Sequence, residues 1–151
     1  MPERRVSDLY LNFGHALDHL AMLIYPTAIL AIGTEVVGSY GEALRLSIGG
    51  FIAFGACSLP AGWLGDRWSR HAMMVVFFIG IGAACILTGL ARTPFQIAVA
   101  LTMIGAFAAI YHPVGIAMLV GGRENVGRVL GINGVAGNLG VAFAALATAG
   151  L

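Results

Sequence analysis

The sequence predicts an all-α membrane protein in which residues 1–151 form a single transmembrane helical domain. Hydrophobic residues make up 59% of the chain and charged residues only 10%, whereas a soluble domain carries about 25% charged residues. The mean hydropathy of +0.90 also indicates that most of the surface does not face water. Five segments approach the roughly 20 apolar residues that a spanning helix needs: residues 8–32, 43–64, 71–91, 94–120 and 126–151.

The breaks between these segments contain turn residues or charge. They are residues 33–42, the link around Asp66, Arg92-Thr93-Pro94, and residues 121–128. Pro94 fits the first turn of a helix, where its missing N–H is not needed. Because lipid offers no partner to a backbone polar group, a spanning segment must be a helix or a barrel strand. These segments are too long and too continuously apolar for strands, so we expect helices.

The distribution of arginine predicts the orientation of the helices. The chain has eight basic residues, all of them arginine. If the five segments span the membrane, one side collects Arg4, Arg5, Arg67, Arg70, Arg123 and Arg128, and the other side has Arg45 and Arg92. Cytoplasmic loops carry the excess of arginine and lysine. We therefore expect an inner-membrane protein with a cytoplasmic amino terminus and Leu151 at the opposite face.

Several classes of chemistry have no support in the sequence. The net charge of +1 indicates neither a nucleic acid nor a polybasic partner. Cys57 and Cys85 lie inside apolar segments, where we expect small hydrophobic side chains rather than a disulfide or a metal pair. Phosphate-loop, Cys-x-x-Cys and His-Glu-x-x-His motifs are absent, and neither Ser47 nor Ser58 lies in a Gly-x-Ser-x-Gly setting. We expect no enzyme activity, no cofactor and no metal site.

The first segment contains an ionisable cluster, His15, Asp18 and His19, and is too long for a cleavable signal peptide. At 1.5 Å per residue, Asp18 lies about 15 Å past the start of the segment, near the bilayer midplane. A carboxylate there opposes insertion by about 2.5–3.5 kcal/mol, so it needs a partner, a cavity or a proton. We predict that Asp18 carries a proton together with His15. The alternative is a structural polar cluster that fixes the first helix to its neighbours.

The fourth segment carries Tyr111-His112-Pro113. His112 lies about 12 Å from the end of this segment and His15 about 10 Å from the start of its own, so the two histidines have similar depth. Pro113 frees the carbonyl of Ala109 and favours a kink. If the two helices are adjacent, we expect a substrate cavity lined by His112, Tyr111 and His19. The alternative is a kink that only shapes packing.

Small residues recur along the fifth segment. Gly131, Gly134, Gly137 and Gly140 follow one another every third residue, and we expect this stripe to let another helix approach closely. Asn138 lies in the same stretch, near mid-membrane. We expect its amide to form a hydrogen bond to another helix.

Residues 62–71 form a short polar link between the second and third segments, which makes those helices antiparallel neighbours. The link resembles the G-x-L-x-D-R-x-G-R-[KR] loop of the major facilitator superfamily of transporters. The matching residues are Gly62, Leu64, Asp66, Arg67 and Arg70, whereas Ser69 and His71 depart from the pattern. The resemblance implies that Gly62, Asp66, Arg67 and Arg70 belong to a gating loop at the inward face. The alternative is an ordinary positively charged turn.

Three further motifs resemble the fosmidomycin-resistance branch of that superfamily. They are His15 with Asp18, Tyr111-His112-Pro113 with Gly115, and Gly137-Asn138-Leu139-Gly140, in which Ala136 replaces a preceding glycine. Members of the branch are proton-driven exporters of drugs or small metabolites. The superfamily builds each half from six helices. The resemblance therefore implies the amino-terminal half of a major facilitator fold, incomplete at five helices.

Two functions remain open. The first is a proton-coupled transporter half that exports a small drug-like or metabolite solute, with a second transporter half as its partner. The second is a truncated, transporter-derived accessory or structural subunit of a larger membrane complex, with no transport of its own. In both cases the lipid bilayer surrounds the chain.

Overall fold

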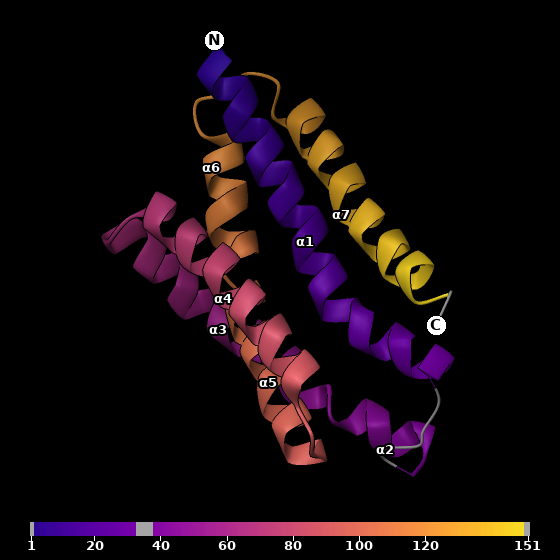
Figure 1. The fold of residues 1–151 in the computed structure, drawn as a ribbon. Coiled ribbons are helices and arrows are strands. Elements are labelled where there is room, and N and C mark those ends of the chain that lie inside the picture. The colour runs from indigo at the N-terminus through magenta and orange to yellow at the C-terminus, as the bar shows by residue number, and fades with distance from the viewer. Residues whose placement is uncertain (1, 33–37, 150–151) are drawn as a thin grey trace.

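Every regular element in the described part of the chain, residues 2–32 and 38–149 of a computed structural model, is helical (Figure 1). The elements are α1 (Pro2–Ile32), α2 (Tyr40–Arg45), α3 (Ile48–Arg67), α4 (Arg70–Leu90), α5 (Pro94–Ala108), the π-helical turn η1 (Tyr111–Gly115), α6 (Ile116–Val120) and α7 (Val126–Thr148). The all-α prediction is confirmed.

Two of the expected helices are interrupted. Residues 43–64 correspond to the end of α2 and most of α3, with a turn at Ser47, whose hydroxyl donates to the carbonyl of Leu44 (2.7 Å). Residues 94–120 correspond to α5, η1 and α6 in succession. The remaining bounds shift at the ends: α1 already begins at Pro2, and α7 ends at Thr148. Leu151 lies outside the described residues.

The predicted polar loop between the second and third helices is shorter than expected. Because α3 continues to Arg67 and α4 begins at Arg70, only Trp68 and Ser69 lie between them. Ser69 forms the N-cap of α4, where its hydroxyl accepts a hydrogen bond from the N–H of Ala72 (3.2 Å). Asp66 therefore belongs to the last turn of a helix rather than to a loop.

Four helical stretches are long and apolar enough to cross a membrane: Tyr40–Arg67, Arg70–Leu90, Pro94–Val120 and Val126–Thr148. Helix α1 is not among these four, so the described helices include four clear candidate spans, consistent with the expected incomplete bundle of about five. Although α1 is 31 residues long, its polar residues lower its hydropathy. Asp18 and His15 are nevertheless buried against other helices, so they do not present charge to lipid.

The helices pack in two groups. Helix α7 lies along α1, whereas α5 packs against both α3 and α4 (Figure 1). The hydroxyl of Thr27, on α1, donates to the carbonyl of Ala144 on α7 (3.2 Å). The turn η1 contacts α1, α3 and α4, so it lies where the two groups meet. Its Tyr111 is fully buried in the apolar core beside Leu11 and Phe77.

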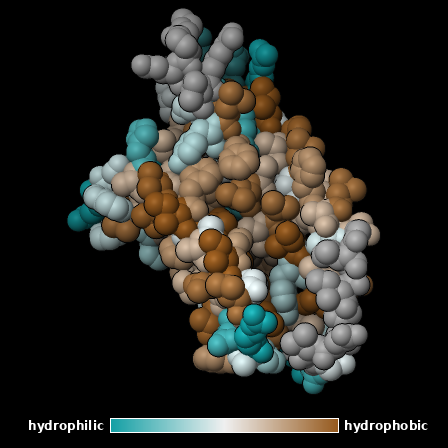
Figure 2. Space-filling view, viewed as in Figure 1, coloured by the Kyte–Doolittle hydropathy of each residue, from teal (hydrophilic) through white to brown (hydrophobic). Residues whose placement is uncertain are grey.

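The outer surface is largely apolar. Large hydrophobic side chains such as Leu59, Ile79, Phe95 and Leu146 are more than half exposed. Figure 2 shows apolar residues over the middle of one face, with hydrophilic residues mostly toward its margins. An apolar surface of this extent is typical of contact with lipid.

Candidate functional site

The middle of α1 buries the polar residues that the sequence singles out. His15 is 7% exposed and Asp18 is 0% exposed, whereas His19 is half-buried. Nε2 of His19 and Nε2 of His15 are 3.1 Å apart, as expected for imidazoles one helical turn apart. One helix face therefore presents two imidazoles, with a carboxylate beside them.

The fourth predicted helix brings a third imidazole to this face through η1. Pro113 has no N–H to donate, and the backbone here forms a π-helical turn. Within this stretch the N–H of Val114 still donates to the carbonyl of Ile110, four residues earlier (3.2 Å). Helix α3 approaches closely at this turn. A Cβ added to Gly62 would lie 3.1 Å from Cβ of Pro113, and one on Gly65 would lie 2.9 Å from Cγ2 of Val114.

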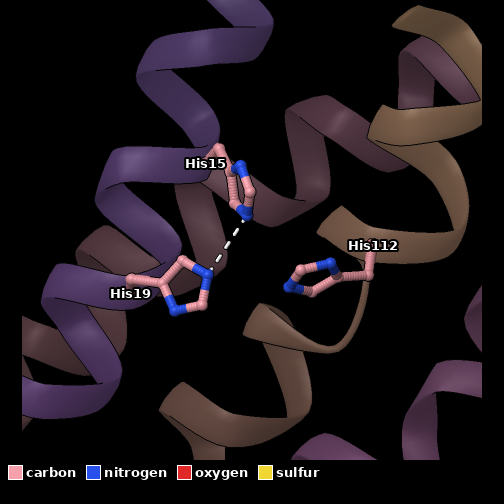
Figure 3. A group of neighbouring side chains, drawn as sticks. All are labelled: His15, His19 and His112. Atoms are coloured by element: carbon pink, nitrogen blue, oxygen red, sulfur yellow. Dashed lines mark hydrogen bonds between the residues drawn. The ribbon is translucent and has the colours of Figure 1, made fainter. Parts of the chain in front are cut away.

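The two helices are adjacent at this level, which is the condition under which the sequence predicts that these side chains meet. Nε2 of His112 lies 3.4 Å from Oδ2 of Asp18. The ring of His112 is perpendicular to that of His15, with centroids 5.2 Å apart. One nitrogen from each of His15, His19 and His112 lies within 4.8 Å of the others. Figure 3 shows the three rings turned toward a common space, two from α1 and one from η1.

The carboxylate of Asp18 has no hydrogen-bond partner in the described part of the chain. Both of its oxygens are buried, and neither receives a hydrogen bond from the described residues. Leaving a buried polar group unpaired is costly, and more so for an ion. The burial of this carboxylate, with Nε2 of His112 at 3.4 Å, marks Asp18 as a candidate functional group.

Asn133 connects this cluster to α7, although nothing in the sequence pattern singles it out from Asn138. Its side-chain amide donates to Oδ1 of Asn12 (2.9 Å) and to the hydroxyl of Tyr111 (2.8 Å). Its backbone carbonyl accepts from Nδ1 of His15 (2.8 Å). An asparagine inside an apolar helix is the same signal that singles out Asn138, so the sequence does contain a clue. Only the rotation of α7 shows which of the two faces α1.

Tyr111 does not line an open cavity. It is fully buried, stacks on His15 with centroids 4.9 Å apart, and donates its hydroxyl proton to the carbonyl of Leu11 (2.8 Å). The predicted cavity role of Tyr111 is therefore replaced by a packing role. His19 and His112 remain partly exposed. A hollow of about 320 Å³ lies elsewhere, between α4 and α5 near Phe95, and touches none of the three histidines.

The predicted glycine stripe divides in two. A Cβ on Gly140 would meet the backbone carbonyl of Ala16, and one on Gly137 would lie 2.7 Å from Cε1 of His15. By contrast, Gly131 and Gly134 face open space. Asn138 is exposed and donates to the carbonyl of Gly134 in its own helix (2.9 Å), so the expected bond to another helix is not formed among the described residues.

Ion pairs lie at the helix ends near the predicted gating residues. Arg70 donates to Oδ1 of Asp66 from its Nε (3.2 Å) and a terminal nitrogen (2.7 Å). The guanidinium of Arg67 lies 5.1 Å from the ring centroid of Trp63. A further pair, missed in the sequence, joins Arg123 to Asp8. It connects the beginning of α1 to the link that follows α6.

The comparisons with known proteins agree with this architecture. The family model described as Major Facilitator Superfamily matches residues 11–151. The chain belongs to that superfamily. The match accounts for an all-α membrane fold of which this chain holds a part, and it indicates transport rather than catalysis.

One distantly similar protein is described as a transporter. This chain is 27% identical over 103 residues to a protein described as a probable actinorhodin transporter, from Streptomyces coelicolor (strain ATCC BAA-471 / A3(2) / M145). The alignment covers 68% of this chain and 18% of the relative, so the chain spans less than a fifth of the relative's length. No solved structure matches this chain significantly. The resemblance to the fosmidomycin-resistance branch stays a prediction.

Proposed function

We propose that this chain forms part of a proton-coupled secondary transporter that exports a small drug-like or metabolite solute. Membership of the superfamily supports transport. The proton coupling rests on one observation, the buried carboxylate of Asp18, which has no hydrogen-bond partner within residues 2–32 and 38–149. An ionisable residue buried between transmembrane helices commonly belongs to a proton relay, and in this proposal Asp18 exchanges its proton when water or a cation reaches it.

The neighbours of Asp18 give the proton a route and the solute a contact. His112 lies 3.4 Å from the carboxylate and is partly exposed, so it connects Asp18 to the surface of this helix group. His15 is hydrogen-bonded to His19, so the series of titratable side chains continues along α1. In this proposal Asp18 and His15 carry the proton, and His112 and His19 meet the solute.

The remaining predicted roles belong to the same proposal. Asp66, Arg67 and Arg70 form the gate at the cytoplasmic face of an inner membrane, and Gly62 lets α3 pack against the π-turn at Pro113. The amino terminus is cytoplasmic. A second transporter half completes the pathway.

The test uses Asp18→Asn in the complete carrier, reconstituted in proteoliposomes with a panel of drug-like solutes that includes actinorhodin. An amide has the shape of a protonated carboxyl group, so the variant should insert at wild-type levels. It should lose transport driven by a pH gradient while solute exchange persists. Glu124→Gln is the control, because Glu124 is exposed in the link before α7.

Two results would count against the proposal. If Asp18→Asn still couples solute movement to the pH gradient, the proton is carried elsewhere. If the wild-type assembly moves no solute in either direction, the accessory-subunit hypothesis takes its place.

A further inference from the structure

We propose that His15, His19 and His112 bind a divalent first-row transition-metal ion of the Zn²⁺ type, with Asp18 as the adjoining carboxylate. This goes beyond the proposed function, because binding an ion requires neither export nor proton coupling. The sequence predicts no metal site, since the third ligand comes from a different helix and from no metal-binding motif.

The spacing of the imidazoles fits one ion. A Zn–N bond is about 2.0–2.1 Å long, so two nitrogens on a tetrahedral ion are about 3.3 Å apart. Nε2 of His15 and Nε2 of His19 are 3.1 Å apart, and the nitrogen of His112 lies within 4.8 Å of both. A small movement of the partly exposed His112 brings all three to bonding distance.

The hydrogen bond to Asn133 prepares His15 as a ligand. Nδ1 of His15 lies 2.8 Å from the backbone carbonyl of Asn133, which accepts only from an N–H. Neutral His15 therefore carries its proton on Nδ1 and has a lone pair on Nε2, the atom that faces His19. Metal-binding histidines commonly donate their other nitrogen to a carbonyl or carboxylate in this way.

Asp18 supplies the second, independent observation. Its carboxylate is buried, accepts no hydrogen bond from the described residues and lies 3.4 Å from Nε2 of His112. A purely structural polar cluster would satisfy these oxygens. An ion held by the three imidazoles would instead offset the negative charge of the carboxylate.

The set of ligands selects the class of ion. Three imidazoles suit Zn²⁺, Co²⁺, Ni²⁺ or Cu²⁺, whereas Mg²⁺ and Ca²⁺ prefer oxygen ligands. Access is available because His19 and His112 are partly exposed. We therefore expect saturable binding of Zn²⁺ and of its spectroscopic substitute Co²⁺, and none of Mg²⁺.

The experiment uses the full protein, purified in nanodiscs with any associated chains and stripped of metal by a chelator. Co²⁺ is added while visible absorption is recorded, and Zn²⁺ binding is measured by calorimetry. Wild type should bind one ion per chain and show the intense bands of a four-coordinate site. Because loss of an outer-shell partner alone costs about 10–100-fold in affinity, loss of a ligand should cost at least about 100-fold.

The chain provides its own control. It has four histidines, and the fourth, His71, is exposed at the start of α4. His19→Gln and His112→Gln should each lose Zn²⁺ affinity and the Co²⁺ bands, whereas His71→Gln should behave as wild type. Both cluster variants change partly exposed side chains, and unchanged thermal unfolding without metal checks that each folds.

Three results would overturn the inference: no saturable binding to wild type, wild-type affinity in the double variant of His19 and His112, or an equal loss in His71→Gln. None of them bears on proton coupling, which the solute transport of Asp18→Asn tests separately. Conversely, loss of metal binding in the cluster variants supports the site even if no solute is transported.

Discussion

Replacing Gly140 by alanine tests the contact between α1 and α7 most directly. A Cβ at this position would overlap the backbone carbonyl of Ala16, and a carbonyl within a helix cannot turn aside as a flexible side chain can. The two helices must separate locally. Overpacking of this kind costs about 1–3 kcal/mol.

The matched control is Gly134→Ala in the same helix, where an added Cβ meets nothing within 4 Å. Alanine stabilises a helix by about 0.5–1 kcal/mol relative to glycine, and this gain is common to both variants. The difference between them is therefore the overpacking cost alone. At about 1.4 kcal/mol per factor of ten, it corresponds to a roughly 5- to 140-fold difference in the unfolding equilibrium constant.

The assay is reversible unfolding in bicelles or mixed micelles, with helix content followed by circular dichroism. Gly134→Ala should equal or exceed wild type in stability, and Gly140→Ala should fall below it. Equal stability of the two variants would show that α1 and α7 do not pack at Gly140, and the arrangement of the His15 and Asn133 contacts would then be wrong as well.

Three further predictions concern other parts of the chain. Asp66→Asn should slow transport by the complete carrier without lowering its membrane level, because the exposed Asp66–Arg70 pair contributes only about 0–1 kcal/mol to stability. Transport assays and immunoblots check this, and a wild-type transport rate would show that Asp66 has no role in gating. Asn133→Ala should lower the free energy of unfolding by about 1 kcal/mol, because it removes two hydrogen bonds between helices. Asn138→Ala should change this free energy little. A larger loss of stability in Asn138→Ala than in Asn133→Ala would contradict the observed rotation of α7. Reporter fusions at residues 68, 93, 124 and 151 should report cytoplasm, outside, cytoplasm and outside in turn, and activity only in the cytoplasm at 151 would exclude five spans.

Hydropathy and turn residues were enough to predict the helical class and most helix positions. Helices α4 and α7 lie close to their predicted ranges, and α5 begins at Pro94 as expected. These properties are local, because a long apolar segment in lipid must satisfy its own backbone. Depth along a helix is also a local quantity, which explains why the sequence predicted the shared level of His15 and His112.

The sequence did not determine which way each helix faces. Helix α7 is apolar on nearly all sides, so nothing in its pattern distinguishes Asn133 from Asn138, or Gly140 from Gly134. Their different contacts arise only when α1 packs along one face of α7. Likewise, the sequence places His15 and His19 on one face, but only the packing of η1 against α1 adds His112 beside Asp18. Helix formation is decided within a segment, whereas a site built from two helices depends on their relative rotation, which packing of the whole bundle fixes.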